Sequence, residues 1–243
     1  MSGAVEFPAV RAQTLIELDR HDEAVPLLLQ ALASDPDDTW LLDLLAQAQL
    51  QVDPAAALAT SRKLIALEPD DHRGHLLAAL AARKSAGARD AERHARQAVE
   101  LAPHSPNAHV VLAQTLVDRK RKLREAMRHA KEAVELAPHD AMGYLTAGNV
   151  ELRRGHGRQA DVWYRRALDL DPTDQTAAAN LALTHSVRGR PAEALAEASA
   201  LLRVDPQDEW ARHVLHDAVY TTLVHLQWVA LVIAFVAAIA RVG

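Results

Sequence analysis

The stretch AVELAP occurs twice in the chain, at residues 98–103 and 133–138, and it decides the fold. Four related stretches also end in proline: ALASDP at 31–36, LIALEP at 64–69, ALDLDP at 167–172 and LLRVDP at 201–206. The six prolines follow one another at steps of 33, 34, 35, 34 and 34 residues. A period of this length is typical of a solenoid built from repeated supersecondary units.

Small residues keep a fixed register around these prolines. An alanine lies twelve residues before each proline, and an alanine or glycine lies ten residues after the first five. The two sets are Ala24, Ala57, Ala91, Ala126, Ala160 and Ala194, and Ala46, Ala79, Ala113, Gly148 and Ala182. Small side chains allow two helix axes to approach closely, so we expect helices to pack at these positions.

Each repeat is predicted to form two amphipathic helices. Ala126, Ala130 and Ala133 follow the spacing of one buried helical face, and Pro138 ends that helix. Two sites combine a capping residue with a proline in the first helical turn: Asp53–Pro54 and Ser105–Pro106. Glycines that allow a left-handed turn lie between the two helices of three repeats: Gly87, Gly155 or Gly157, and Gly189.

This pattern resembles the tetratricopeptide repeat family over roughly residues 5–218. The resemblance implies an all-α fold, an α-solenoid in which six helix-turn-helix units form a right-handed superhelix, followed by a C-terminal apolar helix. We expect a repeat array over residues 5–206, a seventh or capping helix over 207–222 and a transmembrane helix over 223–241.

The chain departs from the family at its aromatic positions. The aromatic residue early in the first helix is kept only as Tyr144, and the one in the middle of the second helix only as Tyr164. The first position is occupied in the other units by Leu42, His75, His109 and Ala178.

The resemblance also implies a concave groove, lined by the first helices of successive units, in which a partner binds. The groove candidates in this register are Leu44, Gln47, Leu76, Leu77, Leu80, Asn107, Val110, Val111, Gln114, Leu145, Thr146, Asn149, Asn180 and Leu183. Asn149 and Asn180 occupy places where peptide-binding members use asparagine to hold the peptide backbone. An alternative interpretation is that many of the leucines simply pack between neighbouring repeats.

The resemblance limits the kind of partner. Members that bind chaperone tails clamp a terminal carboxylate with basic residues, and Leu145, Trp210 and Val214 stand in those places here. The expected partner is therefore a protein or peptide that offers an apolar helix or an extended segment, since leucine and valine dominate the candidate positions.

The C-terminal segment has a different character. Residues 228–240 carry no polar side chain, and extension back to Leu223 gives 18 residues, about 27 Å of helix. This length is close to the thickness of a bilayer, so we expect a membrane anchor. We expect the repeats to lie in the cytoplasm, because the N-terminal stretch MSGAVEFPAV does not resemble a signal peptide. The anchor residues would be Trp228, Val229, Leu231, Ile233, Phe235 and Ile239. The alternatives are a soluble cytoplasmic protein whose tail mediates homo-oligomerisation or docking, and a capping helix that closes within the monomer.

Composition and motifs argue against several function classes. The formal net charge of −5 argues against nucleic acid as a partner, and the absence of cysteine excludes a disulfide framework or a thiol nucleophile. The pairs His72/His75 and His213/His216 have helical spacing, yet neither has a third ligand in sequence, so we expect no metal site and no cofactor. No phosphate loop, dinucleotide motif or zinc-protease motif is present.

The residues 119–124, RKRKLR, form the densest charged run. They coincide with the 35-residue repeat, so we expect an enlarged, solvated turn; contact with anionic lipid is the alternative. Taken together, the sequence predicts a non-enzymatic scaffold that binds a protein or peptide partner and is tethered to a membrane. The alternative function is a soluble assembly factor or chaperone of the same fold. The 22 arginines against five lysines are typical of a GC-rich, bacterial genome.

Overall fold

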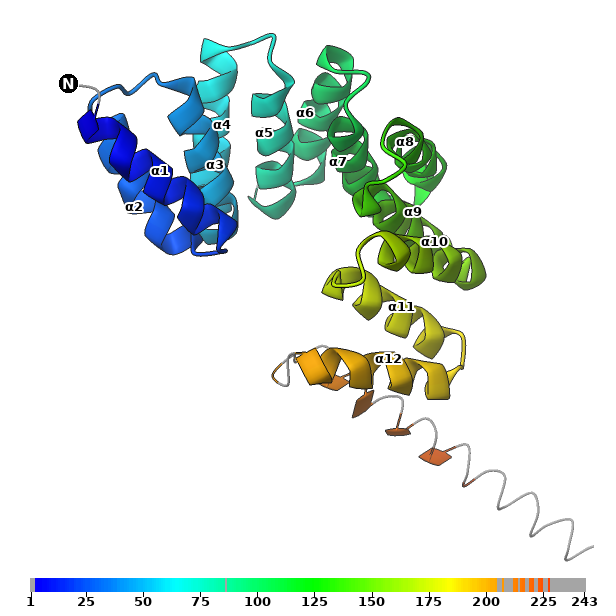
Figure 1. The fold of residues 1–243 in the computed structure, drawn as a ribbon. Coiled ribbons are helices and arrows are strands. Elements are labelled where there is room, and N and C mark those ends of the chain that lie inside the picture. The colour runs from blue at the N-terminus through cyan, green and yellow to red at the C-terminus, as the bar shows by residue number, and fades with distance from the viewer. Residues whose placement is uncertain are drawn as a thin grey trace, which may run out of the picture. The chain divides into compact units, whose positions relative to one another are not determined.

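Helices account for all regular secondary structure in the described part of the chain. The structure is a computed structural model that describes residues 3–85 and 87–204, together with 207, 212–213, 215–216, 219–220, 223–224 and 227. The described residues contain twelve α-helices and one short 3-10 helix (Figure 1). The chain divides into two compact units, Met1–Ala137 and Pro138–Gly243, and we describe each by itself.

Unit 1 contains four helix pairs in which each helix packs against its neighbour in the chain (Figure 1). The first helices of successive pairs also contact one another directly, as α3 contacts α5 and α5 contacts α7. The helices are α1 (Gly3–Glu17), α2 (His21–Leu32), α3 (Thr39–Val52), α4 (Pro54–Leu67), α5 (His72–Ser85), α6 (Ala88–Leu101), α7 (Pro106–Val117), the 3-10 helix η1 (Lys120–Lys122) and α8 (Leu123–Leu136).

Unit 2 contains two helix pairs of the same kind within its described residues. The first helices α9 and α11 contact each other, and α10 lies in contact with both. The helices are α9 (Ala141–Arg153), α10 (Gly157–Leu170), α11 (Gln175–Val187) and α12 (Pro191–Val204). The expectation of stacked helix pairs, one pair per repeat, is therefore confirmed over the described helices.

The helix ends lie where the local sequence signals place them. The Asp53 carboxylate accepts hydrogen bonds from the backbone N–H groups of Ala55 and Ala56, at 3.0 and 3.1 Å, at the start of α4. Gly87 and Gly155 adopt positive φ angles of 99° and 79°. Of the two glycines near the turn of the fifth repeat, Gly155 is thus the left-handed one. Pro26, although inside α2, does not interrupt that helix.

The alanine register forms the centre of the helix pairs. The six alanines that open the second helices are at most 1% exposed: Ala24, Ala57, Ala91, Ala126, Ala160 and Ala194. The small residues of the first helices, ten residues after the prolines, are constrained in the same way: a Cβ atom on Gly148 of α9 would clash with the ring of Tyr164. The small residues are therefore required by close helix packing, as the sequence predicts.

The expected C-terminal helices fall largely outside the described residues. The anchor candidates Trp228, Val229, Leu231, Ile233, Phe235 and Ile239 all lie outside them, as does most of the expected seventh helix. No helix within the described part of the chain combines the length and hydropathy that a bilayer span requires.

Candidate interaction groove

The candidate groove residues lie on the first helices of their pairs. They come from α3, α5 and α7 in unit 1 and from α9 and α11 in unit 2. Because first helices contact one another within each unit, each unit presents its own face lined by these residues. We call these the first-helix faces of unit 1 and unit 2.

The candidates differ in how much surface they offer to a partner. Six are at most 8% exposed and pack mainly within the protein: Leu44, Leu77, Val110, Val111, Leu145 and Thr146. Seven are half-buried and present part of the side chain to solvent: Gln47, Leu76, Leu80, Gln114, Asn149, Asn180 and Leu183. Asn107 is exposed.

Asn149 and Asn180 are joined on the first-helix face of unit 2. The Asn180 side-chain Nδ2 donates a hydrogen bond of 2.9 Å to Asn149 Oδ1, which also accepts one of 2.8 Å from the hydroxyl of Tyr164. Tyr164 is fully buried on α10, so this second bond satisfies a polar group that water does not reach. Among the described residues, the pair leaves the side-chain N–H groups of Asn149 and the side-chain oxygen of Asn180 without a hydrogen bond.

One further residue on the first-helix face of unit 1, Asp43, is not among the candidates that the sequence pattern predicts. Asp43 of α3 lies seven residues after Pro36, in the register that holds Leu76, Val110 and Leu145 in later repeats. It is 8% exposed, and its Oδ2 accepts a hydrogen bond of 2.6 Å from Gln47 Nε2. Burial raises the pKa of Asp43, although Gln47 and Arg73 act in the opposite direction. The sequence does contain a signal for Asp43, because it is a carboxylate at a position that is apolar in the next three repeats.

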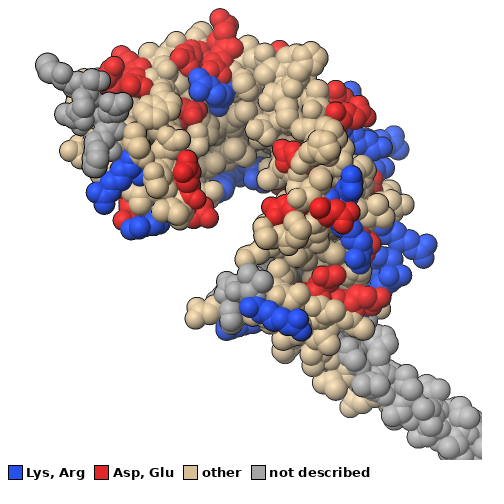
Figure 2. Space-filling view, in the orientation of Figure 1, with Lys and Arg blue, Asp and Glu red and all other residues tan. Residues whose placement is uncertain are grey.

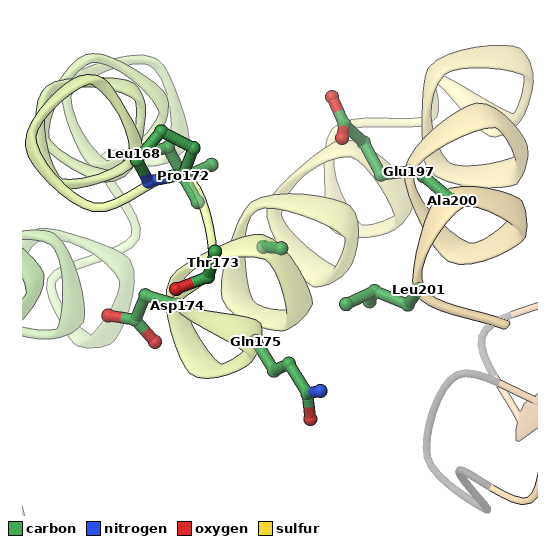
Figure 3. Close-up of a pocket in the computed structure, with 9 residues that line it drawn as sticks. Leu168, Pro172, Thr173, Asp174, Gln175, Glu197, Ala200 and Leu201 are labelled. Atoms are coloured by element: carbon green, nitrogen blue, oxygen red, sulfur yellow. The ribbon is translucent and has the colours of Figure 1, made fainter. Parts of the chain in front are cut away.

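A pocket of about 410 Å³ lies in unit 2, between the end of α10, the start of α11 and the end of α12 (Figure 3). Leu201 points from α12 toward α11 there. Ala178 and Glu197, which also line the pocket, occupy the register of Tyr144 and Trp163 in the preceding repeat. That aromatic pair packs with its ring centres 5.9 Å apart. The pocket therefore lies where the last repeat lacks the aromatic pair of the one before it.

Comparison with known families identifies the fold. A tetratricopeptide repeat model matches residues 76–141 and 145–209, more than half of the chain, and a second tetratricopeptide repeat model matches residues 9–38. The chain belongs to the tetratricopeptide repeat (TPR) family. A comparison with curated proteins gives no match.

Solved structures share this TPR fold. The chain is similar to one in the APC/C heterotetramer Cut9–Hcn1, with a TM-score of 0.76, 15% identity and 88% of this chain covered. It spans 42% of that chain. It also resembles PilW, a type IV pilus biogenesis factor, with a TM-score of 0.70 and 13% identity over 88% of this chain and 100% of PilW. A third similar structure is that of YrrB, a TPR protein with an unusual peptide-binding site. Its TM-score is 0.51 and its sequence identity is 18%, and the match covers 76% of this chain and 96% of YrrB.

Two TPR units replace the aromatic contact between their helices with a pair of histidines. His75 Nδ1 lies 3.1 Å from His94 Nδ1, and His109 Nδ1 lies 2.9 Å from His129 Nδ1. Burial lowers the pKa of His94 and His129 to about 4, with neighbouring arginines and the partner histidines adding to the shift. These pairs hold helices together, and the described residues contain no cluster of three or more metal-binding side chains.

The basic run forms the turn between α7 and α8 of its TPR unit, as expected. Arg119 and Lys122 both pair with Glu92 of α6, which also accepts from Arg96. Burial opposes ionisation of Glu92, yet the bonds from Lys122 and Arg96 lower its pKa. Figure 2 shows further basic side chains gathered along the edge of α8. Two of the five basic residues in the run, Arg119 and Lys122, thus anchor the turn to the preceding unit.

Proposed function

We propose that this chain is a non-enzymatic TPR scaffold that binds a segment of a partner protein along its first-helix faces. TPR arrays are extended scaffolds for protein–protein interaction. The observation that carries the proposal is the joined pair Asn149 and Asn180, in which the side-chain N–H groups of Asn149 and the side-chain oxygen of Asn180 take no part in the hydrogen bonds of the described residues. A peptide group offers the complementary acceptor and donor, so the pair can hold a peptide backbone without reading its side chains.

The half-buried leucines give the expected partner its apolar character. Leu76 and Leu80 lie one turn apart on α5, and Leu183 lies three residues after Asn180 on α11. All three leucine side chains are partly open to solvent. A partner with an apolar helix face or apolar side chains along an extended segment would bury this surface. The solved TPR protein YrrB has a peptide-binding site, which supports the same mode here.

The test of the binding face is a substitution that leaves the fold intact. Asn180→Ala removes the donor to Asn149 but preserves the bond between Asn149 and Tyr164. We expect it to weaken the affinity for peptides selected by the full chain from a random library about tenfold, with little change in unfolding. The control is Gln159→Ala, an exposed amide on α10. Equal affinity of both variants would contradict the proposed face.

Asn149→Ala is a poor probe for the same purpose. It would leave the buried Tyr164 hydroxyl without its acceptor, which costs about 1–3 kcal/mol of stability. A loss of binding in that variant would therefore mix a local defect in the fold with the loss of a contact.

The proposed location is the cytoplasmic face of a membrane, with residues 223–241 as the anchor. The apolar sequence of residues 228–240 supports this part of the proposal. The alternative is a soluble assembly factor or chaperone whose tail mediates oligomerisation or docks on a partner.

Fractionation separates the anchored scaffold from the soluble factor. The full chain is compared with its Val229→Lys/Phe235→Lys variant, since lysine near the middle of a span opposes insertion. An anchor predicts that only the unchanged chain resists carbonate extraction from membranes and requires detergent. A full chain that stays soluble as a defined oligomer would favour the assembly factor.

A further inference from the structure

The carboxylate of Asp43 lies on the first-helix face of unit 1, where no residue in the described part of the chain forms an ion pair with it. The side chain is 8% exposed. Its Oδ2 accepts a hydrogen bond from Gln47. Its Oδ1 accepts none from the described residues and is not among the enclosed unpaired atoms, so it still meets solvent. An ionised carboxylate that is largely buried and unpaired is costly to retain.

Packing does not require an acid at this place. The same register holds Leu76 on α5, Val110 on α7 and Leu145 on α9, which shows that the helix pairs accept an apolar side chain there. Burial raises the pKa of Asp43, and this is the expected sign for a carboxyl group that the fold itself does not stabilise as an anion.

Arg73, the arginine that acts electrostatically on Asp43, is already engaged by other acids. Arg73 at the start of α5 lies 2.7 Å from Asp71 and 3.5 Å from Glu68. Glu68 and Asp71 also act on Asp43 electrostatically and raise its pKa further. The Glu68 oxygen that lies 3.5 Å from Arg73 is enclosed and accepts no hydrogen bond among the described residues. Figure 2 shows acidic side chains gathered over the turn between α4 and α5. This end of the face therefore carries an excess of negative charge.

An exposed aromatic residue stands beside the acid. Trp40 lies one turn before Asp43 on α3, where side chains three residues apart share a face, and it is 46% exposed. A carboxylate and an indole ring on one face are the groups that favour a cationic side chain, through an ion pair and a cation–π contact.

We infer that Asp43 receives a lysine or arginine side chain of the bound partner segment, beside Trp40 and within the apolar first-helix face of unit 1. This inference rests on the proposed function, because it names the chemistry of the segment bound there. The partner would be an apolar segment with one basic residue. Its cation would neutralise a carboxylate that has already lost most of its water in the free protein, so little further desolvation opposes the ion pair.

The test uses the full chain, its Asp43→Asn variant and the matched control Asp70→Asn. Asparagine keeps an oxygen acceptor for Gln47 and removes only the charge, while Asp70 is an exposed acid in the turn between α4 and α5. Each protein selects peptides from a random twelve-residue library. We expect the unchanged chain and Asp70→Asn to enrich apolar peptides with lysine or arginine at one fixed position, and Asp43→Asn to lose the basic preference.

A quantitative readout follows from the selected peptide. Replacing its lysine with norleucine should weaken binding to the unchanged chain about tenfold and binding to Asp43→Asn less than twofold. In addition, the pKa of Asp43, followed by carboxyl NMR, should fall when the lysine peptide binds. Asp43→Lys should select peptides with an acidic residue at the same position, which a purely structural role of Asp43 would not produce.

The outcomes separate this inference from the proposed function. Peptides that show no basic preference, yet lose affinity for Leu76→Glu, overturn the role of Asp43 and leave the binding face in place. An equal effect of norleucine on the unchanged chain and on Asp43→Asn also overturns it. Selection of no peptide by the unchanged chain overturns both proposals.

Discussion

Tyr164 links the packing of unit 2 to its candidate binding residues. Its ring, fully buried on α10, fills the space that Gly148 leaves on α9. Its hydroxyl donates to Asn149, which in turn accepts from Asn180. Burial raises the pKa of Tyr164, so the phenol stays a hydrogen-bond donor at all physiological pH values. One aromatic residue thus fixes both a helix contact and the orientation of an amide on the exposed face.

Gly148→Ala should destabilise the protein because its Cβ would clash with the ring of Tyr164. We expect a loss of about 1–3 kcal/mol in the free energy of unfolding, measured by urea denaturation, despite the higher helix propensity of alanine. Gly157→Ala is the control, since its closest neighbour would be the flexible side chain of Arg188, and Thr184 would lie at an ordinary van der Waals distance of 3.8 Å. Equal stability of the two variants would show that the close contact with Tyr164 does not limit packing.

The functional candidates were less accessible to sequence reasoning than the small residues of the core. Ala126 and Gly148 follow from a period that repeats along the chain. Asp43, by contrast, interrupts such a period, and its significance depends on which counter-ions lie nearby. The sequence does not reveal that Arg73 is held by Asp71, because this depends on the local geometry at the start of α5.

At the scale of the helix, most boundaries could be predicted because each is set by residues close in sequence. Proline ends the second helices, and Asp53 or Ser105 caps the start of a following helix. The contacts between helices could be predicted only where a small side chain, such as that of Ala126 or Gly148, is needed for two helices to approach closely. The pairing of His75 with His94 depends on two helices meeting at one point, and spacing within one helix instead suggested His72 as its neighbour.

Each second helix should fail to pack if its opening alanine is enlarged. Ala126→Leu places three more carbon atoms at a fully buried helix contact. We expect about 1–3 kcal/mol of lost stability by urea denaturation. Ala59→Leu, at an exposed position of α4, is the matched control and should change stability by less than about 0.5 kcal/mol. A stable Ala126→Leu protein would argue against the repeat register.

The histidine pairs should make helix packing sensitive to acid. His94 and His129 have pKa values of about 4 in the folded chain, below the ordinary value near 6.5. The unfolded chain therefore takes up protons first, so the stability is complete above about pH 6.5 and is lost as the pH falls toward 4. At pH 5 the loss should be about 2 kcal/mol for each histidine.

Urea denaturation at pH 7 and pH 5 measures this effect. The double variant His94→Asn/His129→Asn keeps polar side chains but removes the titration, so its stability should differ less between the two pH values. His104→Asn is the control, because that histidine is exposed in the turn before α7. An unchanged pH dependence in the double variant would place the acid sensitivity elsewhere.

At the scale of the whole molecule, stability is distributed along the chain. In a repeat array each helix pair contacts mainly its neighbours, so the free energy of unfolding is approximately a sum of local terms. Unit 1 contains four described helix pairs, two of them joined by histidine pairs, whereas unit 2 contains two among its described residues. The second pair of unit 2 also has the pocket at Ala178 and Glu197. We therefore expect unit 2 to be the less stable part.

Filling this pocket should stabilise unit 2 selectively. Ala178→Leu adds apolar surface toward Leu201 and Leu168, which line the same space, and should raise stability by about 1 kcal/mol. The measurement is urea denaturation of two versions of the full chain, one with Trp40 and one with Trp163 as the sole tryptophan, the other tryptophans being replaced by phenylalanine. The urea concentration at the midpoint of unfolding should be lower when Trp163 reports it than when Trp40 does. In Ala178→Leu the midpoint reported by Trp163 should rise, while the midpoint reported by Trp40 stays unchanged. Ala192→Leu, exposed on α12, should move neither. If the units unfold separately, a change within unit 2 alters only the stability of unit 2. Equal shifts of both midpoints would therefore mean that the two units unfold together.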